Sequence, residues 1–258
     1  MSKLSRFFKK FYLGVILLFL YIPIAVMFVQ SFNAGKSRAK WEGFSFRWYG
    51  ELFADTSIMN ALQVTVSIAV LAMIVSTVLG TLAAIGIHAM RKRPQAAMMT
   101  LTNLPNTMPD IVTGISLMLL FLFTKVERGY MTMLLAHITF DTPYVILSVM
   151  PKLKQMNKHT YEAALDLGAT PTYALTHVII PQCKQGIITG AMLAFTLSLD
   201  DFTISYFTTS PLVQNLSTLI YSSARKGIDP SLNALSALMF VALLVLLLIV
   251  NRRTADNN

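Results

Sequence analysis

Apolar residues in this chain occur in long runs that shorter polar segments separate. Five runs cover residues 11–29, 64–87, 131–149, 186–208 and 232–250. Each has about the 20 residues that a helix needs to cross a bilayer. A sixth run, 96–123, is interrupted by LPNTMPD, so we expect a helix broken near Pro105 and Pro109. The pattern predicts an all-α integral membrane protein with six transmembrane helices in one domain, 1–258, and both termini on the same side.

The polar segment 157–181 lies between the apolar runs 131–149 and 186–208, the fourth and fifth along the chain, and contains EAALDLGATPTYALTHVIIP. Helix-forming residues from about Asn157 to Leu167 are followed by Gly168, which suits a left-handed helix end. Thr170 before Pro171 is typical of an N-cap with proline in the first turn. We therefore expect two short helices at an angle, outside the membrane.

Composition agrees with a membrane protein. Of the 258 residues, 55% are hydrophobic and 13% are charged, with a mean hydropathy of +0.60, whereas a soluble domain is about 25% charged. The polar loops are too short for a sizeable soluble domain. The net charge of +9 is not by itself evidence of nucleic-acid binding, because the charges first have to be placed relative to the bilayer. The single cysteine, Cys183, excludes an internal disulfide.

The distribution of basic residues predicts the orientation. With the N-terminus in the cytosol, 13 of the 21 Lys and Arg residues lie on the cytosolic side and 8 on the opposite side. This excess favours cytoplasmic N- and C-termini. The basic residues of segment 1–10, followed by the apolar run 11–29, could be taken for a secretory signal. No extended soluble domain follows, however, so an uncleaved first span is favoured. The segment 157–181 then faces the cytosol.

Four acidic residues fall within or at the edge of the runs, and no Lys or Arg does. They are Asp110, Asp141, Asp200 and Asp201. A charge at the centre of a span costs about 2.5–3.5 kcal/mol on insertion scales. These carboxylates therefore require a cation from elsewhere or protonation. A passing cationic substrate would supply the missing charge.

Structural roles compete with a pathway role at two of these residues. Asp110 follows Pro109 and can cap the second half of the broken helix, a role that does not exclude another. Asp141 precedes Thr142 and Pro143, and a capping role is favoured there. His137 is a lone histidine in an apolar run, so packing or a helix–helix hydrogen bond is favoured over a proton relay.

Asp200 and Asp201 are harder to explain as structural residues. Asp200 lies roughly 21 Å along a helix from Gly186, in the outer half of the bilayer. On a continuous helix it would share one stripe with Thr189, Thr196 and Thr203, and Ser198, Asp201 and Ser205 would flank that stripe. Such a polar stripe is typical of a pathway lining. We therefore assign Asp110, Asp141, Asp200, Asp201, Thr196 and Thr203 as candidate pathway residues.

Several kinds of site are missing from the sequence. It contains no G-x-x-x-x-G-K-[ST] phosphate loop, so the chain cannot hold ATP phosphates by that device. Four histidines and one cysteine, widely separated, give no metal-ligand spacing. No nucleophile–base arrangement is recognisable. We expect no catalytic residue, no metal and no cofactor bound by this chain.

The segment 162–181 resembles the EAA signature of ABC-type import permeases, E-A-A-x3-G-x9-I-x-L-P. Glu162, Ala163, Ala164, Gly168 and Pro181 match it, while Val178 and Ile180 replace the I and the L. The resemblance implies a type I ABC importer permease (MetI-like) fold and a cytoplasmic coupling loop. It makes Glu162, Ala163, Ala164, Asp166, Gly168 and Pro181 candidate ATPase-coupling residues.

Further stretches resemble permease subunits of bacterial spermidine/putrescine importers over nearly the whole chain. They are KWEGFSFRWY (40–49), MPDIVTGISL (108–117), HITFDTPYV (137–145), LSLDDF (197–202) and DPSLNALS (229–236). The resemblance implies an inner-membrane complex with a second, related permease, two ATPase subunits that hold ATP and Mg, and a periplasmic polyamine-binding protein. The carboxylates alone would equally suit a metal cation or a cationic vitamin.

The mechanism that follows is a mechanical one. The ATPase pushes Glu162–Gly168, the push passes through Pro181 to the fifth span, and the acidic residues offer countercharge to the solute. Two alternatives differ in class. A proton-driven secondary transporter would use Asp141, Asp200 or His137 as relays and would need no ATPase. A purely structural subunit would tolerate neutralising Asp200 and Asp201 together.

Overall fold

The computed structural model describes residues 3–37, 40–157, 159–226 and 229–255. For residues 3–9, 225–226 and 246–255 only the backbone is described. Among the basic residues used for the orientation, Arg38 and Lys158 lie outside the described residues, and Lys158 also belongs to segment 157–181.

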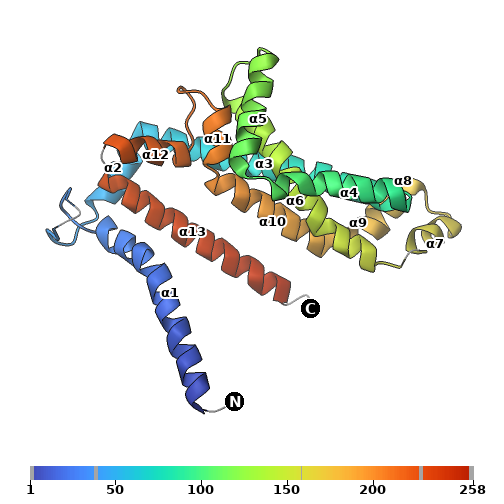
Figure 1. Ribbon diagram of the computed structural model, residues 1–258, viewed down its shortest axis with the longest axis horizontal. Coiled ribbons are helices and arrows are strands. Elements are labelled where there is room, and N and C mark those ends of the chain that lie inside the picture. The colour runs from blue at the N-terminus through green and yellow to red at the C-terminus, as the bar shows by residue number, and fades with distance from the viewer. Residues whose placement is uncertain (1–2, 38–39, 158, 227–228, 256–258) are drawn as a thin grey trace. The chain divides into compact units, whose positions relative to one another are not determined.

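The described chain is helical, as expected of an all-α protein. The helices are α1 (Lys3–Ser31), α2 (Arg47–Ala54), α3 (Thr56–Ala89), α4 (Lys92–Thr107), α5 (Asp110–Phe123), α6 (Tyr130–Gln155), α7 (Thr160–Asp166), α8 (Pro171–Ala174), the π-helical η1 (Leu175–Ile179), α9 (Ile180–Gln182), α10 (Lys184–Asp200), α11 (Thr203–Thr208), α12 (Leu216–Lys226) and α13 (Pro230–Ala255) (Figure 1). Extended pairing within the described ranges is limited to isolated bridges, Asn33 with Phe44 and Ser210 with Val213.

Three described helices are long and apolar enough to cross a membrane alone: α1 from Lys10, α3 and α6. Two bent pairs qualify together, α4 with α5 and Pro171–Gln182 with α10, which gives up to five spans in the part of the chain described. The sixth expected run, 232–250, falls within α13, whose apolar part with described side chains is Pro230–Val245.

The chain forms two compact units. Unit 1 comprises residues 1–59 and 220–258, and unit 2 comprises residues 60–219. In unit 1, α13 packs against α1 and α2. Trp48 is buried there and donates its indole N–H to the carbonyl of Asn33. Trp48 therefore packs against the loop before α2 and does not belong to an exposed surface.

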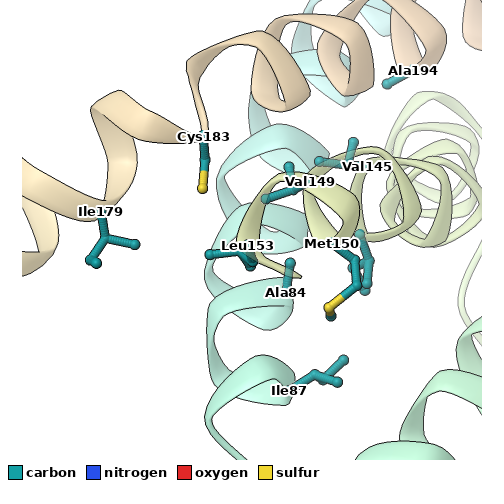
Figure 2. Packing of buried hydrophobic residues seen from close by; sticks show 10 residues of the cluster. Ala84, Ile87, Val145, Val149, Met150, Leu153, Ile179, Cys183 and Ala194 are labelled. Carbon is teal, nitrogen blue, oxygen red and sulfur yellow. The ribbon is translucent and has the colours of Figure 1, made fainter. Parts of the chain in front are cut away.

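Unit 2 is built around α6, which packs closely with α3 and α10. A Cβ added at Gly80 of α3 would lie 2.6 Å from Cβ of Val145, and one added at Gly186 of α10 would lie 2.8 Å from the carbonyl oxygen of Ser148. These glycines therefore permit the close approach of backbones that small residues allow in membranes. Val145, Val149 and neighbouring buried residues form the apolar core beside them (Figure 2).

The interrupted run forms two helices at a sharp angle. The chain bends by 103° between α4 and α5, which Figure 1 shows as the change of direction in green. The break lies at Met108 and Pro109, whereas Pro105 remains inside α4. The expected break is therefore confirmed at its second proline, because Pro109 supplies the extended backbone before α5 begins.

Candidate functional site

Two parts of unit 2 contain the candidate coupling residues and the two adjacent aspartates. We call Thr160–Gln182 the elbow and Asp200–Phe202 the acidic turn. Figure 1 shows α7, α8 and α9 together at one end of the unit, away from α11. Helix α10 joins the two regions, and its 17 residues span about 25 Å.

The elbow has the local structure that its sequence predicts. Gly168 follows α7 with φ +88°, and its amide donates to the carbonyl of Leu165. The amide of Ala169 donates to the carbonyl of Ala164, which completes a Schellman helix end. Thr170 then caps α8, because its side-chain oxygen accepts from the amide of Tyr173 at 3.3 Å.

The elbow presents an apolar surface around a shallow hollow. A space of about 490 Å³ is lined by Ala164, Leu167, Gly168, Ala169, Thr170, Tyr173 and Val178. The side chain of Leu167 is 90% exposed. Glu162 is also exposed, and its carboxylate lies 2.9 Å from Nδ1 of His159. Ala163, Asp166 and Pro181 are exposed on the same segment. The elbow therefore exposes both apolar and acidic groups.

Buried residues tie the elbow to the core of unit 2. Ile179 at the end of η1 and Cys183 after α9 pack with Leu153 of α6 and with Ala84 and Ile87 of α3 (Figure 2). The elbow therefore shares a buried apolar cluster with α6 and α3.

The fifth run is not one continuous helix, which corrects the expected stripe. Helix α10 ends at Asp200, and α11 begins at Thr203. The physical reason is Asp201, whose two carboxylate oxygens accept from the amides of Ile204 at 3.2 Å and Ser205 at 2.7 Å. This side chain starts a new helix. Thr203 therefore does not continue the face that carries Thr196 and Asp200.

The two adjacent aspartates occupy different environments. Asp200 is exposed at the end of α10, whereas the side chain of Asp201 is only 9% exposed. Asp110, the first residue of α5, and Thr196 are exposed too, while Thr203 is half-buried. Of the acidic candidates, Asp200 and Asp110 are thus accessible and Asp201 is engaged within the fold.

His137 connects the helices on both sides of the acidic turn. Its Nδ1 lies 2.6 Å from Oγ of Ser198 in α10, and its Nε2 lies 2.9 Å from Oγ of Ser205 in α11. The same Nε2 is 3.6 Å from Oδ2 of Asp201. The helix–helix hydrogen bonds expected for this histidine are confirmed.

Asn215, which no sequence pattern predicted, completes this network. Its amide nitrogen donates to Oγ of Ser205 at 2.8 Å and to the carbonyl of Asp201 at 3.3 Å. No periodic signal points to Asn215, because it lies in the irregular segment before α12. Ser198 and Ser205 did carry a signal, their spacing around the aspartates.

Asp141 is completely buried, one helical turn after His137 on α6. Neither carboxylate oxygen has a hydrogen-bond donor among the residues that the structure describes. The expected cap is absent, because α6 continues without a break through Thr142 and Pro143. Asp141 is therefore a buried acidic group without a structural partner in the described chain.

Comparisons with known proteins identify the family of this chain. Residues 76–253 match the family described as the binding-protein-dependent transport system inner membrane component. The chain belongs to this family. Its members include transport permeases, and the all-helical MetI-like architecture of the chain is that of ABC importer permeases.

Two curated relatives and one solved structure are similar over most of the chain. The putrescine transport system permease protein PotI of Escherichia coli K12 is 39% identical over 231 residues, 87% of this chain and 82% of PotI. The spermidine/putrescine transport system permease protein PotC of Haemophilus influenzae is 34% identical over 256 residues, 99% of this chain and all of PotC. A bacterial ABC transporter involved in the import of alginate is 15% identical, covers 98% of both chains and has a TM-score of 0.78.

Proposed function

We propose that this chain is a permease subunit of an ATP-driven importer for polyamines. The observation that carries the proposal is its 34–39% identity to putrescine and spermidine/putrescine permeases over most of its length. Accessible carboxylates at Asp200 and Asp110, with no Lys or Arg pairing with them among the described residues, support a cationic solute. Polyamine amino groups are protonated at neutral pH, as the lysine amine is.

The partners follow from the same proposal. A second permease completes the pathway, two ATPase subunits hold ATP and Mg, and a periplasmic binding protein delivers the polyamine. The family description, which names dependence on a binding protein, supports the last of these. This chain hydrolyses no ATP itself. Its N- and C-termini lie in the cytoplasm, as the excess of basic residues on that side indicates.

The coupling residues act in the elbow. The exposed Glu162 and the apolar hollow beside Ala164 and Gly168 receive the ATPase, while Ala163, Asp166 and Pro181 complete the contact surface. Movement of the elbow passes through Ile179 and Cys183 into the core and along α10 to the acidic turn. Asp200 and Asp110 then meet the solute directly, Thr196 lines the same accessible face, and Thr203, Asp141 and Asp201 act from within the fold.

The test is uptake by the purified complex in liposomes. The chain is reconstituted with its second permease and ATPase, the binding protein is added outside, and labelled putrescine or spermidine is followed. We expect accumulation that requires internal Mg-ATP and the binding protein. Uptake driven by a pH gradient in vesicles that lack the ATPase would identify a secondary transporter instead. ATP-dependent uptake of another cation, without polyamine uptake, would reassign the solute.

A further inference from the structure

The acidic turn is held from both sides by one imidazole. Ser198 lies two residues before Asp200, and Ser205 lies four residues after Asp201. His137, which is 1% exposed, contacts the hydroxyl of each serine. A neutral imidazole offers one donor and one acceptor, and a serine hydroxyl can satisfy either. The imidazole can therefore satisfy both serines at once.

The remaining contacts restrict the turn further. Asp201 binds the first amides of α11, and Asn215 donates to the carbonyl of Asp201 and to Ser205. Ser217 donates to the carbonyl of Asp200 at 3.4 Å. None of these contacts uses the side chain of Asp200. The carboxylate of Asp200 stays at the exposed end of α10.

We infer that His137 is a positioning residue for solute recognition: by joining Ser198 to Ser205 it fixes the acidic turn and so sets where the Asp200 carboxylate meets an ammonium group. This inference rests on the proposed function and goes beyond it by assigning different roles to the two adjacent aspartates. Asp200 contacts the cation, while Asp201, with His137, holds the turn. Preorganised groups bind more tightly because less ordering is needed on binding.

Two conservative variants divide the imidazole's contacts. The amide of asparagine reaches about as far as Nδ1, and that of glutamine about as far as Nε2. His137→Asn thus retains the contact with Ser198, and His137→Gln retains the contact with Ser205. Both keep a polar group in the buried position, which limits misfolding. Thr139→Val is the matched control, because Thr139 lies on the same helix, is exposed, and donates only to the carbonyl of Leu135.

The experiment measures polyamine-dependent ATP turnover of the assembled complex against polyamine concentration, with the binding protein present. We expect His137→Asn and His137→Gln each to raise the half-maximal concentration about tenfold with little change in maximal turnover. Thr139→Val should leave both values unchanged. A residue with a merely structural role would change the yield of complex and its stability, but not the half-maximal concentration of the complex that assembles.

A double-mutant cycle tests the link through the imidazole. Ser198→Ala should cause no further rise in His137→Gln, which has already lost that contact, and a clear rise in His137→Asn. Equal effects of Ser198→Ala in both backgrounds, or unshifted half-maximal concentrations in the His137 variants, would overturn the inference while the proposed function stands. A wild-type complex that does not respond to polyamines would overturn the proposed function and this inference with it.

Discussion

At the scale of single residues, the acidic turn gives two adjacent carboxylates different tasks. Asp201 accepts two backbone amides of α11 and faces His137, while Asp200 is exposed. A carboxylate that caps a helix contributes to stability whatever passes by it. If Asp200 binds the polyamine as proposed, its exposed carboxylate contributes to affinity and little to stability.

Replacing each aspartate by alanine should therefore separate affinity from stability. Asp200→Ala should raise the polyamine concentration for half-maximal uptake about tenfold and leave the thermal midpoint of the complex unchanged. Asp201→Ala should lower stability by about 1 kcal/mol through loss of the cap. Asp201→Asn should restore most of that stability, since asparagine caps as well as aspartate. Equal thermal midpoints for Asp200→Ala and Asp201→Ala would contradict this division.

Removing the carboxylate of Asp141 should raise thermal stability, whereas removing that of Asp201 should lower it. Its carboxylate is fully buried with no described donor, and burying such a group costs about 1–3 kcal/mol or more. Leucine has nearly the same shape and no polar atom. Asp141→Leu should therefore raise the midpoint of thermal aggregation by a few degrees, measured on the detergent-solubilised complex. If Asp141 assists the solute from within the fold, uptake should fall in the same variant. A lowered midpoint would show that the carboxylate has a stabilising partner.

At the scale of elements, the elbow was the most predictable part of the site. Gly168 and the pair Thr170–Pro171 determine backbone geometry locally, so one sequence suffices to place a left-handed helix end and an N-cap. The end of α10 had no such signal, because neither glycine nor proline follows Asp200 in LSLDDFTISYF. The Asp201 carboxylate starts the next helix there, and the tertiary hydrogen bonds from His137 and Asn215 that hold the turn are encoded by no local pattern.

The left-handed backbone conformation of Gly168 allows a test of coupling through the elbow. An added Cβ would meet no atom within 4 Å, yet φ +88° disfavours any L side chain, by about 1–2 kcal/mol. Gly168→Ala should therefore distort the elbow and leave ATP turnover poorly linked to uptake, measured as polyamine molecules imported per ATP hydrolysed. Gly86→Ala is the control, because Gly86 lies in α3 with equal space and ordinary backbone angles. An unchanged ratio for Gly168→Ala would argue against coupling through this turn.

At the scale of the whole molecule, the fold alone does not determine the solute. A permease of an alginate transporter shares the architecture with a TM-score of 0.78 at 15% identity, although alginate is acidic and polyamines are cationic. The choice of cargo must then rest on a few side chains, as is general for folds that serve many functions. Asp200 of the acidic turn and Asp110 are accessible carboxylates of unit 2 whose charge fits a cation.

The proposed coupling mechanism requires that the elbow faces a separate ATPase subunit in the cytosol. Its most direct test places a cysteine at Leu167, which is 90% exposed on the elbow, in a Cys183→Ala background that has no other cysteine. A membrane-impermeant maleimide is then applied to vesicles of known orientation, with and without the ATPase. We predict labelling in inside-out vesicles and protection when the ATPase is bound. Labelling in right-side-out vesicles, or no protection by the ATPase, would contradict the account.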